Sequence, residues 1–308
     1  MIFEKKISIV VLTYFHEDYI RRALDTILEQ KVDAPYEILI ADDASGDRTV
    51  EIAEEYRGKY PQIIRLIQNK KNIGISKNLY NALVLCEGEY IVITAGDDYW
   101  IDECKLQKQF TFLENHKEYI AECSVTEGVY TNGEMTGVVS PAKKYWDKEY
   151  PKEDFYQGNI FCDAGIMLRN IFKDEKIKYK FAKMYEFSRD IDDLTFDFFL
   201  FDCGRIYVSG YKSYAITVRR KDDENQHNYN TKYKGIGNTI AHIDLIRKID
   251  DYYENNICLK EWYRPYFGEL LYYGTKCKMY RELKWLNKIP YRYWLGLMID
   301  MIKNTIRR

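Results

Sequence analysis

The first hundred residues alternate between short β-branched runs and segments in which apolar residues recur at helical spacing. The strand-like runs are expected at residues 7–12, 36–41, 65–68 and 89–94, and the helical segments at 18–30, 47–60 and 76–86. Continuous apolar runs are typical of parallel strands that are buried on both faces. Strands joined through helices form right-handed crossovers. The sequence therefore predicts an α/β fold in which a mostly parallel sheet is flanked by helices.

The pattern changes after residue 98. A helix is expected at residues 104–115, antiparallel strands within 120–139, a strand at 160–169, a helix at 194–201, and two strands at 205–208 and 214–218. From residue 233 the spacing is helical to residue 308, with breaks expected at Pro265 and Pro290. These segments predict a less regular second half, followed by a helical C-terminal extension.

The composition of the 308-residue chain is that of a globular protein. Apolar residues make up 46% and charged residues 31%, and the formal net charge of −2 argues against binding to nucleic acid. No apolar run reaches the ~18–20 residues of a membrane-spanning helix, and we expect no signal peptide. The seven cysteines include no CxxC pair, so neither a zinc site nor a disulfide framework is expected. A cytoplasmic location is the expectation.

Polar and acidic residues follow three of the predicted strands. They are Thr13 and Tyr14, then Asp42 and Asp43, then Asp97 and Asp98. Open parallel sheets bind ligands at the carboxyl ends of their strands, so four carboxylates would gather at one edge and repel one another. A divalent cation, Mg²⁺ or Mn²⁺, bridged to phosphate oxygens would compensate this charge.

Each acidic pair by itself also has an ordinary structural explanation. Asp42 and Asp43 could form a strand-to-helix turn with Asp47 as the helix N-cap, and Asp97 and Asp98 could lie in a solvated loop. Motifs of other phosphate sites are missing, because the sequence has no GxGxxG after its first strand and no GxxxxGK[ST]. The four histidines have no metal-ligand spacing. Phosphate binding is therefore expected to depend on a metal.

Four motifs together resemble family 2 glycosyltransferases. They are SIVVLTY, EILIADDASGDRT, Asn72-Ile73-Gly74 with Lys77-Asn78, and GEYIVITAGDD. The resemblance is strong over residues 5–115 and weaker to about residue 220. It implies an inverting, metal-dependent enzyme of the Rossmann-like GT-A fold that uses a nucleotide sugar. It also implies a domain at residues 1–220, with a nucleotide-sugar half at 1–115 and an acceptor half at 116–220, before a helical region at 221–308.

The resemblance implies roles for the residues at the strand ends. Thr13 and Tyr14 would border the base pocket, Asp43 would accept from a uracil-type N–H with Asp42 beside it, Asn72 and Lys77 would approach the nucleotide, Asp98 would bind the metal, and Asp97 would contact the ribose or a metal-bound water. Structural alternatives remain open for two of them, since Tyr14 could be a packing residue and Asn72 could form an Asx turn.

The general base is expected in the acidic segment before residue 204. Counting back from Gly204 by the family pattern places Asp193 at the base position, with Asp192 and Asp190 as alternates. These acids would also suit the N-terminus of the following helix. Downstream, Arg219, Arg220 and His227 belong to a polar loop that either folds over the diphosphate or is simply solvated.

The resemblance implies that a sugar moves from a nucleotide diphosphate, most simply a UDP-sugar, to a glycan or lipid-linked glycan of a bacterial-type surface polysaccharide. The chain lacks the Q/RxxRW motif and the membrane spans of processive synthases, which favours addition of single sugars. Two alternatives stay open. One is a catalytically silent nucleotide- or glycan-binding protein of the same fold, and the other is a sugar nucleotidyltransferase.

The C-terminal segment is basic and aromatic. Residues 260–308 contain 11 Lys or Arg and 4 Asp or Glu, and residues 291–306 place Tyr293, Trp294, Leu297 and Met298 close to one helical face. Such a segment suits peripheral contact with an anionic membrane, which would put the protein at the inner face of the plasma membrane. Packing of the same face on the catalytic domain, or on a second subunit in a homodimer, would produce the same pattern.

Overall fold

The four strands predicted in the first hundred residues lie side by side in one sheet. This computed structural model describes residues 6–159, 161, 163–191, 193–218, 235–254, 256–275 and 277–306. The strands are β1 (Ile7–Thr13), β2 (Tyr36–Asp42), β3 (Ile64–Gln68) and β4 (Tyr90–Ala95), in the order β3-β2-β1-β4. All three pairings among them are parallel, with Ile9 opposite Ile38 and Val92. The predicted parallel order is confirmed here, and it places the carboxyl ends of β1, β2 and β4 at one edge.

Beyond β4 the sheet is mixed. Its further strands are β9 (Ile166–Arg169), β6 (Tyr119–Tyr130), β10 (Arg205–Val218) and β5 (Tyr99–Trp100), with β7 (Met135–Ser140) on β6 and β8 (Lys148–Glu149) on β10. β9 runs antiparallel to β4 and β6, whereas β6 and β10 are parallel. Two predictions are corrected. The strands expected at 205–208 and 214–218 are one strand with register shifts, and of the described residues in the strand expected at 160–169 only Ile166–Arg169 form a strand.

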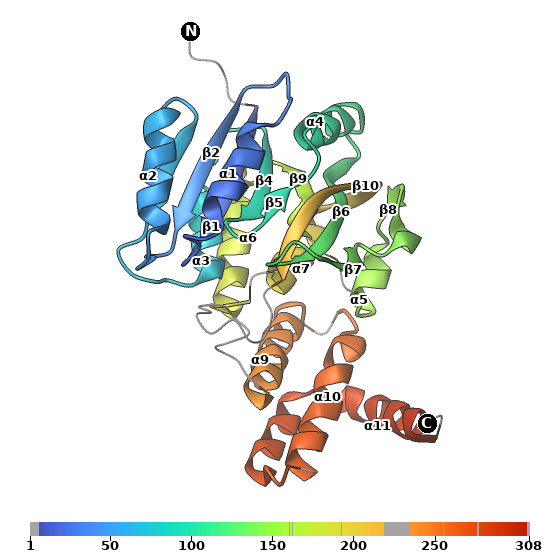
Figure 1. The fold of residues 1–308 in the computed structure, drawn as a ribbon. Helices are drawn as coiled ribbons and strands as arrows, with labels where there is room; N and C mark the ends of the chain where they lie inside the picture. The colour runs from blue at the N-terminus through green and yellow to red at the C-terminus, as the bar shows by residue number, and fades with distance from the viewer. Residues whose placement is uncertain are drawn as a thin grey trace. The chain divides into compact units, whose positions relative to one another are not determined.

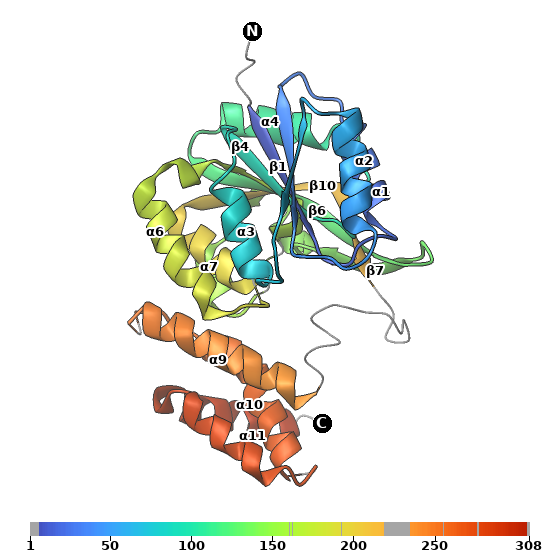
Figure 2. The same ribbon diagram turned by 90° about the vertical axis from the view of Figure 1, so that its left-hand side faces the viewer.

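Helices cover both faces of the sheet (Figures 1 and 2). One face carries α1 (Ile20–Leu28), α2 (Thr49–Lys59) and α4 (Lys105–Asn115), and the other carries α3 (Ile75–Leu83), α6 (Glu175–Met184) and α7 (Asp193–Cys203). Short 3₁₀ segments lie at η1 (Lys143–Tyr145), η2 (Asp163–Gly165), η3 (Ile171–Lys173) and η4 (Tyr185–Phe187). Residues 194–201 of α7 are all buried, and the Phe199 ring lies 4.6 Å from that of Phe181 on α6. A helix that is apolar on all sides must be enclosed in this way.

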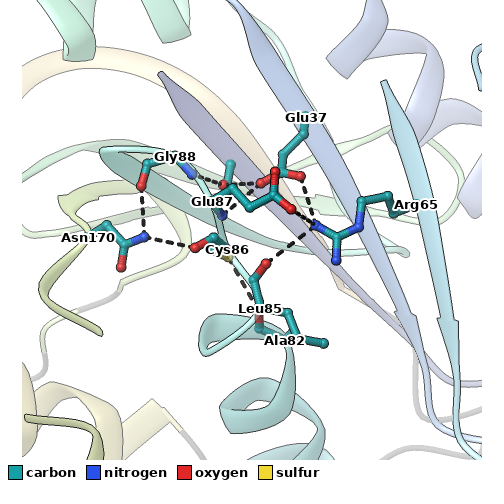
Figure 3. A network of polar contacts seen from close by, with 9 residues as sticks. Glu37, Arg65, Ala82, Leu85, Cys86, Glu87, Gly88 and Asn170 are labelled. Atoms are coloured by element: carbon teal, nitrogen blue, oxygen red, sulfur yellow. Dashed lines mark hydrogen bonds and ion pairs between the residues drawn. The ribbon is translucent and has the colours of Figure 1, made fainter. Parts of the chain in front are cut away.

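A polar network around the buried Glu37 joins the amino ends of the strands (Figure 3). Glu37 on β2 is fully buried and accepts from the Ser8 hydroxyl (2.7 Å) and the Glu87 N–H (2.9 Å), while Arg65 on β3 pairs with it at 3.2 Å. Arg65 also reaches Glu87, and Asn170 donates to the carbonyls of two residues before β4. The network lies at the edge of the sheet opposite the predicted site, so we assign it a structural role.

The chain divides into two units. The first is Met1–Tyr150 with Phe161–Asn225, and the second is Pro151–Ile160 with Gln226–Arg308. The C-terminal unit therefore includes residues 151–160 in addition to the C-terminal region that was predicted to begin at residue 221. The predicted division into domains otherwise stays a prediction.

The second unit is helical. It contains α5 (Lys152–Tyr156), α9 (Ile236–Tyr252), α10 (Lys260–Thr275), η5 (Tyr280–Lys288) and α11 (Tyr291–Ile306). Trp262 donates through Nε1 to the Phe155 carbonyl (3.0 Å), which ties α5 to α10. Pro290 precedes α11 as expected, but Pro265 lies inside α10, so the predicted break there is wrong. A proline so near the start of a helix removes only one hydrogen bond of the helix.

Half of the aromatic face predicted for α11 packs inside this unit. Tyr293 and Leu297 are buried, the Tyr293 hydroxyl accepts from the Leu259 N–H (3.1 Å), and Arg292 forms an ion pair with Asp250 (2.5 Å). Packing therefore accounts for these residues. Among the residues that the structure describes, no helix is long and apolar enough to cross a bilayer.

Candidate active site

The carboxyl ends of β1 and β2 are joined through Asp42. This fully buried carboxylate accepts from the Thr13 hydroxyl (3.0 Å), from the Ser45 N–H (2.9 Å) and from the Ser45 hydroxyl (2.5 Å). The Ser45 hydroxyl in turn accepts from the Phe15 N–H (2.9 Å). Phe15 and Ala44 have positive φ angles of 57° and 62°. Strained backbone of this kind is typical of functional sites, and here it sits at the predicted base pocket.

Asp43 organises the loop after β3. Its carboxylate accepts from the backbone N–H groups of Ile73 and Gly74, both at 2.8 Å, and from the side-chain amide of Asn69 at 3.0 Å. Asn72, on the same loop, donates to the Asp43 carbonyl (3.4 Å). Two predicted site residues, Asp43 and Asn72, are thus brought together. Lys77 lies on α3, with its side chain exposed to solvent.

Gly96 allows the end of β4 to approach the end of β1. A Cβ at residue 96 would come within 2.7 Å of the Thr13 methyl group and 3.0 Å of His16 Nδ1. Asp97 then follows, with Oδ1 3.6 Å from His16 Nε2. The structure therefore brings Asp97 to the same edge as Thr13 and Asp42, and its partly exposed side chain (21%) faces His16. Tyr14 is half-buried, with its ring edge-on to that of Phe15 at 4.7 Å.

Asp98 is buried and oriented by β10. Its Oδ2 accepts from the Tyr214 hydroxyl (3.0 Å) and its Oδ1 from the Thr217 N–H (2.8 Å). Burial and the charge of Asp98 raise the pKa of Tyr214 well above its ordinary value, so this phenol keeps the proton that it donates. The end of β10 is thereby held beside Asp98. Arg219, Arg220 and His227, which follow β10, lie outside the described residues.

The acidic segment before α7 reaches the loop around Asn72. Arg189 donates through Nη2 to both the carbonyl and the side-chain oxygen of Asn72. The neighbouring Asp190 is mostly shielded from solvent, with Oδ1 3.5 Å from Arg189 Nη1. Asp193 begins α7 with an exposed side chain and accepts from the Leu194 N–H (2.8 Å). Asp192 lies outside the described residues.

The carboxylates at this edge of the sheet fit a metal ion whose other ligands come from a bound phosphate. They do not fit a metal ion that is held by protein side chains alone. The described part of the chain has no group of three or more His, Cys, Asp or Glu side chains able to hold a metal ion. Mg²⁺ characteristically binds through one or two carboxylates together with substrate phosphates. Asp97 and Asp98 suit that mode, because carboxylate oxygens have lone pairs to spare beyond the hydrogen bonds that orient them.

Three residues that organise this site are missing from the sequence-based prediction. Asn69 supports Asp43, Tyr214 orients Asp98, and Arg189 binds the Asn72 loop. Asn69 directly follows β3, so its position at a strand end was a usable signal. The contacts of Tyr214 with Asp98 and of Arg189 with Asn72 could not be predicted from the sequence, because each pair is more than a hundred residues apart in the chain.

The family model of Glycosyl transferase family 2 matches residues 8–175, which span β1 to β9. This match covers more than half of the chain, and the chain therefore belongs to glycosyl transferase family 2. The resemblance predicted from the four motifs is confirmed.

Curated relatives match about the same region. An uncharacterized protein of Mycobacterium tuberculosis is 36% identical over 179 residues, which are 58% of this chain and 48% of that protein. A poly(ribitol-phosphate) beta-glucosyltransferase of Bacillus spizizenii is 33% identical over 180 residues, covering 56% of this chain and 27% of that protein. The chain spans about half the length, or less, of these relatives.

Solved structures share the fold. Staphylococcus aureus TarS 1–349 in complex with UDP-GlcNAc superposes with a TM-score of 0.68 at 21% identity, covering 92% of this chain and 79% of that one. The mannosyltransferase PcManGT from Pyrobaculum calidifontis, in complex with GDP-Man and Mn²⁺, gives 0.52 at 16% identity, covering 99% and 87%. The predicted α/β GT-A fold is confirmed.

Proposed function

We propose that this protein is a non-processive, inverting glycosyltransferase that moves a sugar from a nucleoside diphosphate to a hydroxyl of a glycan or lipid-linked glycan. The observation that carries the proposal is the edge of the sheet at which Thr13, Asp42, Asp43, Asp97 and Asp98 meet. Membership of the family supports the reaction class. The likeness to enzymes named for poly(ribitol-phosphate) supports a role in surface-polymer synthesis.

A uridine diphosphate sugar is the proposed donor. TarS, which shares the fold, is solved with UDP-GlcNAc and with UDP. In this proposal Thr13, Tyr14, Asp42 and Asp43 form the wall of the base pocket. The three donors that hold the Asp43 carboxylate fix the loop that carries Asn72, and Lys77 would supply positive charge to the diphosphate.

A divalent cation, Mn²⁺ or Mg²⁺, is the proposed cofactor. Asp98 would hold it, with Asp97 contacting the ribose or a metal-bound water. When bound, the cation would neutralise charge on the leaving diphosphate. The chain's own contribution is a carboxylate whose direction is fixed by Tyr214 and by the Thr217 N–H, so little reorganisation is needed on binding.

Asp193 is the proposed general base, with Asp190 and Asp192 as alternates. Its exposed carboxylate at the first residue of α7 is accessible to an acceptor hydroxyl, whose proton it would remove as the oxygen attacks the anomeric carbon. Attack on the face opposite the leaving diphosphate inverts the anomeric centre. Asp190 is the more shielded of the two described acids.

The test is turnover of the full chain against UDP-, GDP- and dTDP-sugars, with and without EDTA. We expect donor hydrolysis or transfer with a UDP-sugar, lost with EDTA and restored by Mn²⁺. Asp98→Asn should bind UDP–metal weakly and lose activity while it stays folded at the assay temperature, although it should be somewhat less stable because an amide cannot accept from both Tyr214 and Thr217. Nucleotide binding without turnover for any donor would instead favour the catalytically silent alternative. Full activity of a folded Asp98→Asn would refute the metal assignment.

We further propose that the second unit contacts an anionic membrane surface, which would place the protein at the inner face of the plasma membrane. The outward side of α11 is apolar, with Tyr291 and Leu295 each 74% exposed and Met298 and Ile299 also exposed. Exposed cations occur on and beside η5, at Lys278, Arg281, Lys284 and Lys288. No ion pair joins these four to another residue in the described ranges, unlike Arg292. Apolar and aromatic side chains together with unneutralised cations are the pattern that binds anionic lipid.

A further inference from the structure

The contact between Arg189 and Asn72 joins two segments that are 117 residues apart in the chain. One Arg189 nitrogen donates to both oxygens of Asn72, the backbone one at 3.1 Å, and the Arg189 carbonyl accepts from the Ser76 N–H (3.4 Å). The guanidinium and the backbone of Arg189 thus both bind the segment between β3 and α3. We call these interactions the Arg189 contact.

The shape of residue 74 makes the Arg189 contact possible. Gly74 has a φ of 92°, and a Cβ there would overlap the Arg189 side chain and lie 2.5 Å from its carbonyl oxygen. A side chain at residue 74 would therefore push Arg189 away, and the positive φ would strain any other residue. The missing side chain at residue 74 lets Arg189 reach Asn72.

The same loop is held on its other side by the proposed base pocket. The Gly74 N–H donates to Asp43 Oδ2, and the Ile73 N–H to Oδ1. Residues 72–74 therefore lie between Asp43, a residue of the proposed base pocket, and Arg189, which begins the acidic segment that contains the proposed base. One residue after Arg189, Asp190 lies close to the guanidinium.

We propose that Arg189 is a positioning residue that couples the nucleotide-binding loop to the acidic segment at the start of α7. This inference rests on the proposed function and extends it. When the loop is ordered around Asp43, Arg189 holds the residues up to Asp193 at a fixed place beside the donor. Small displacements of a reacting group are costly, since a misplacement of about 1 Å can lower a rate by ~10²-fold.

The kinetic test compares Arg189→Ala with Arg57→Ala in the full chain. Arg57 is a matched control, because it is similarly exposed and, among the described residues, its ion pair is the local one with Glu54. We expect Arg189→Ala to lower kcat of transfer by at least ~10-fold while the Kd of UDP changes less than ~3-fold, and Arg57→Ala to change neither. Arg189→Lys should recover part of kcat, because lysine keeps the charge and lacks the guanidinium fork.

Two outcomes would overturn the assignment. If Arg189→Ala weakens UDP binding as strongly as it lowers kcat, Arg189 contacts the nucleotide or simply stabilises the fold. If its kcat equals that of the wild type, the contact has no role in the reaction.

Gly74→Ala, which displaces Arg189 without removing it, should lower kcat as well. If both substitutions act through the Arg189 contact, the kcat of the double variant should not fall below that of the less active single variant.

A second readout does not depend on activity. Hydrogen exchange of the full chain should show that UDP with Mn²⁺ protects both peptides 69–76 and 188–201 in the wild type. In Arg189→Ala we expect protection of 69–76 to persist and that of 188–201 to be lost. Protection of both segments in the variant would contradict the coupling. If the wild type turns over no donor, the proposed function fails, and the exchange experiment with UDP still decides whether the segments are coupled.

Discussion

Individual carboxylates at the strand ends of this protein have different surroundings, although the sequence presents them as two equal pairs. Asp42 and Asp43 are both buried, yet Asp42 joins β1 to the Ser45 turn whereas Asp43 holds the loop after β3. Asp97 is partly exposed and Asp98 is oriented by two donors from β10. Two adjacent aspartates can therefore have different structural roles, because the fold gives each of them different hydrogen-bond partners.

The proposed base is tested by Asp193→Asn, with Asp190→Asn as the comparison. We expect Asp193→Asn to lower kcat by at least ~10²-fold, a common contribution of a general base, and to leave the Kd of UDP nearly unchanged. The measurement is steady-state transfer together with calorimetric UDP binding. An inactive Asp190→Asn beside an active Asp193→Asn would move the base to Asp190.

Cys86 is expected to be the least reactive of the thiols described at positions 86, 258 and 277. Burial, with the charge of Glu37 adding to it, raises the pKa of Cys86 to about 12. Cys258 and Cys277 are exposed. Because the thiolate is the nucleophile, iodoacetamide at pH 8 should label Cys258 and Cys277 first, as measured by peptide mass spectrometry. Labelling of Cys86 at the same rate would show that this thiol is not protected.

The raised pKa of Cys86 also sets the sign of a pH dependence. The folded chain keeps the thiol proton between about pH 9 and 12, where the unfolded chain loses it, so unfolding releases a proton in that window. The contribution of this thiol to stability is therefore present below pH 9 and declines above it. In urea unfolding, the stability advantage of the wild type over Cys86→Ala should shrink as the pH rises from 8.5 to 10.5.

At the scale of secondary-structure elements, the amino ends of the strands depend on Glu37. Glu37→Gln should lower the free energy of unfolding by about 1–3 kcal/mol, because the buried partners of the carboxylate lose a charged acceptor. Glu87→Gln alters an exposed partner of the same Arg65 and should cost less than about 1 kcal/mol. Urea unfolding of both variants checks this. If the two variants have the same free energy of unfolding, losing the charge of the buried Glu37 is no more destabilising than losing that of the exposed Glu87.

The sequence predicted the elements whose patterns are local. β1 to β4 are continuous apolar runs and the helices between them have apolar residues at helical spacing. Each was expected within two residues of its observed ends, except that α3 ends three residues earlier than expected. β10 was expected as two strands because Ser209 to Ser213 lack an alternating pattern; its pairing with β6 shifts register there, so distant partners and not local sequence keep it continuous. The helix α6 was missed because few of its residues are buried.

The candidate site was predictable in its residues but not in their connections. Strand-end positions marked Thr13, Asp42, Asp43, Asp97 and Asp98, because the fold class fixes where such ends meet. The donors that orient them come from Tyr214, Thr217 and the backbone of residues 73 and 74. Backbone N–H groups have no sequence signature, and a tyrosine on a long strand has none either.

At the scale of the whole molecule, membrane contact can be tested by point substitution. Because Tyr293 and Leu297 are buried in the second unit, removing all of α11 would disturb packing, whereas Leu295→Ser with Met298→Ser changes only the exposed side. We expect the wild type to co-sediment with phosphatidylglycerol vesicles at low salt and less at high salt, and the double variant to bind at least several-fold more weakly. Tyr179→Ser is the control, because Tyr179 on α6 is an exposed aromatic residue whose exposed fraction (64%) lies between those of Leu295 (74%) and Met298 (47%).

Three outcomes separate the explanations of the exposed side of α11. Binding to phosphatidylcholine vesicles as strong as to anionic ones would contradict the role of the cations. No binding at low salt would refute the membrane proposal. A dimer by light scattering that the double variant dissociates would assign the apolar side to a second copy of the chain.

The second unit is also built from two separated stretches, and this has a consequence for synthesis. Between residues 151–160 and the second stretch of this unit, which starts at Gln226, 65 residues of the first unit are translated. At translation rates of about 5–20 residues per second, that interval lasts roughly 3–13 s. During it Phe155, which is fully buried in the finished fold, lacks Trp262, the ring it packs against. The Phe155 ring therefore stays without its partner until α10 has been made, so the second unit can close only after the whole of the first unit has been translated.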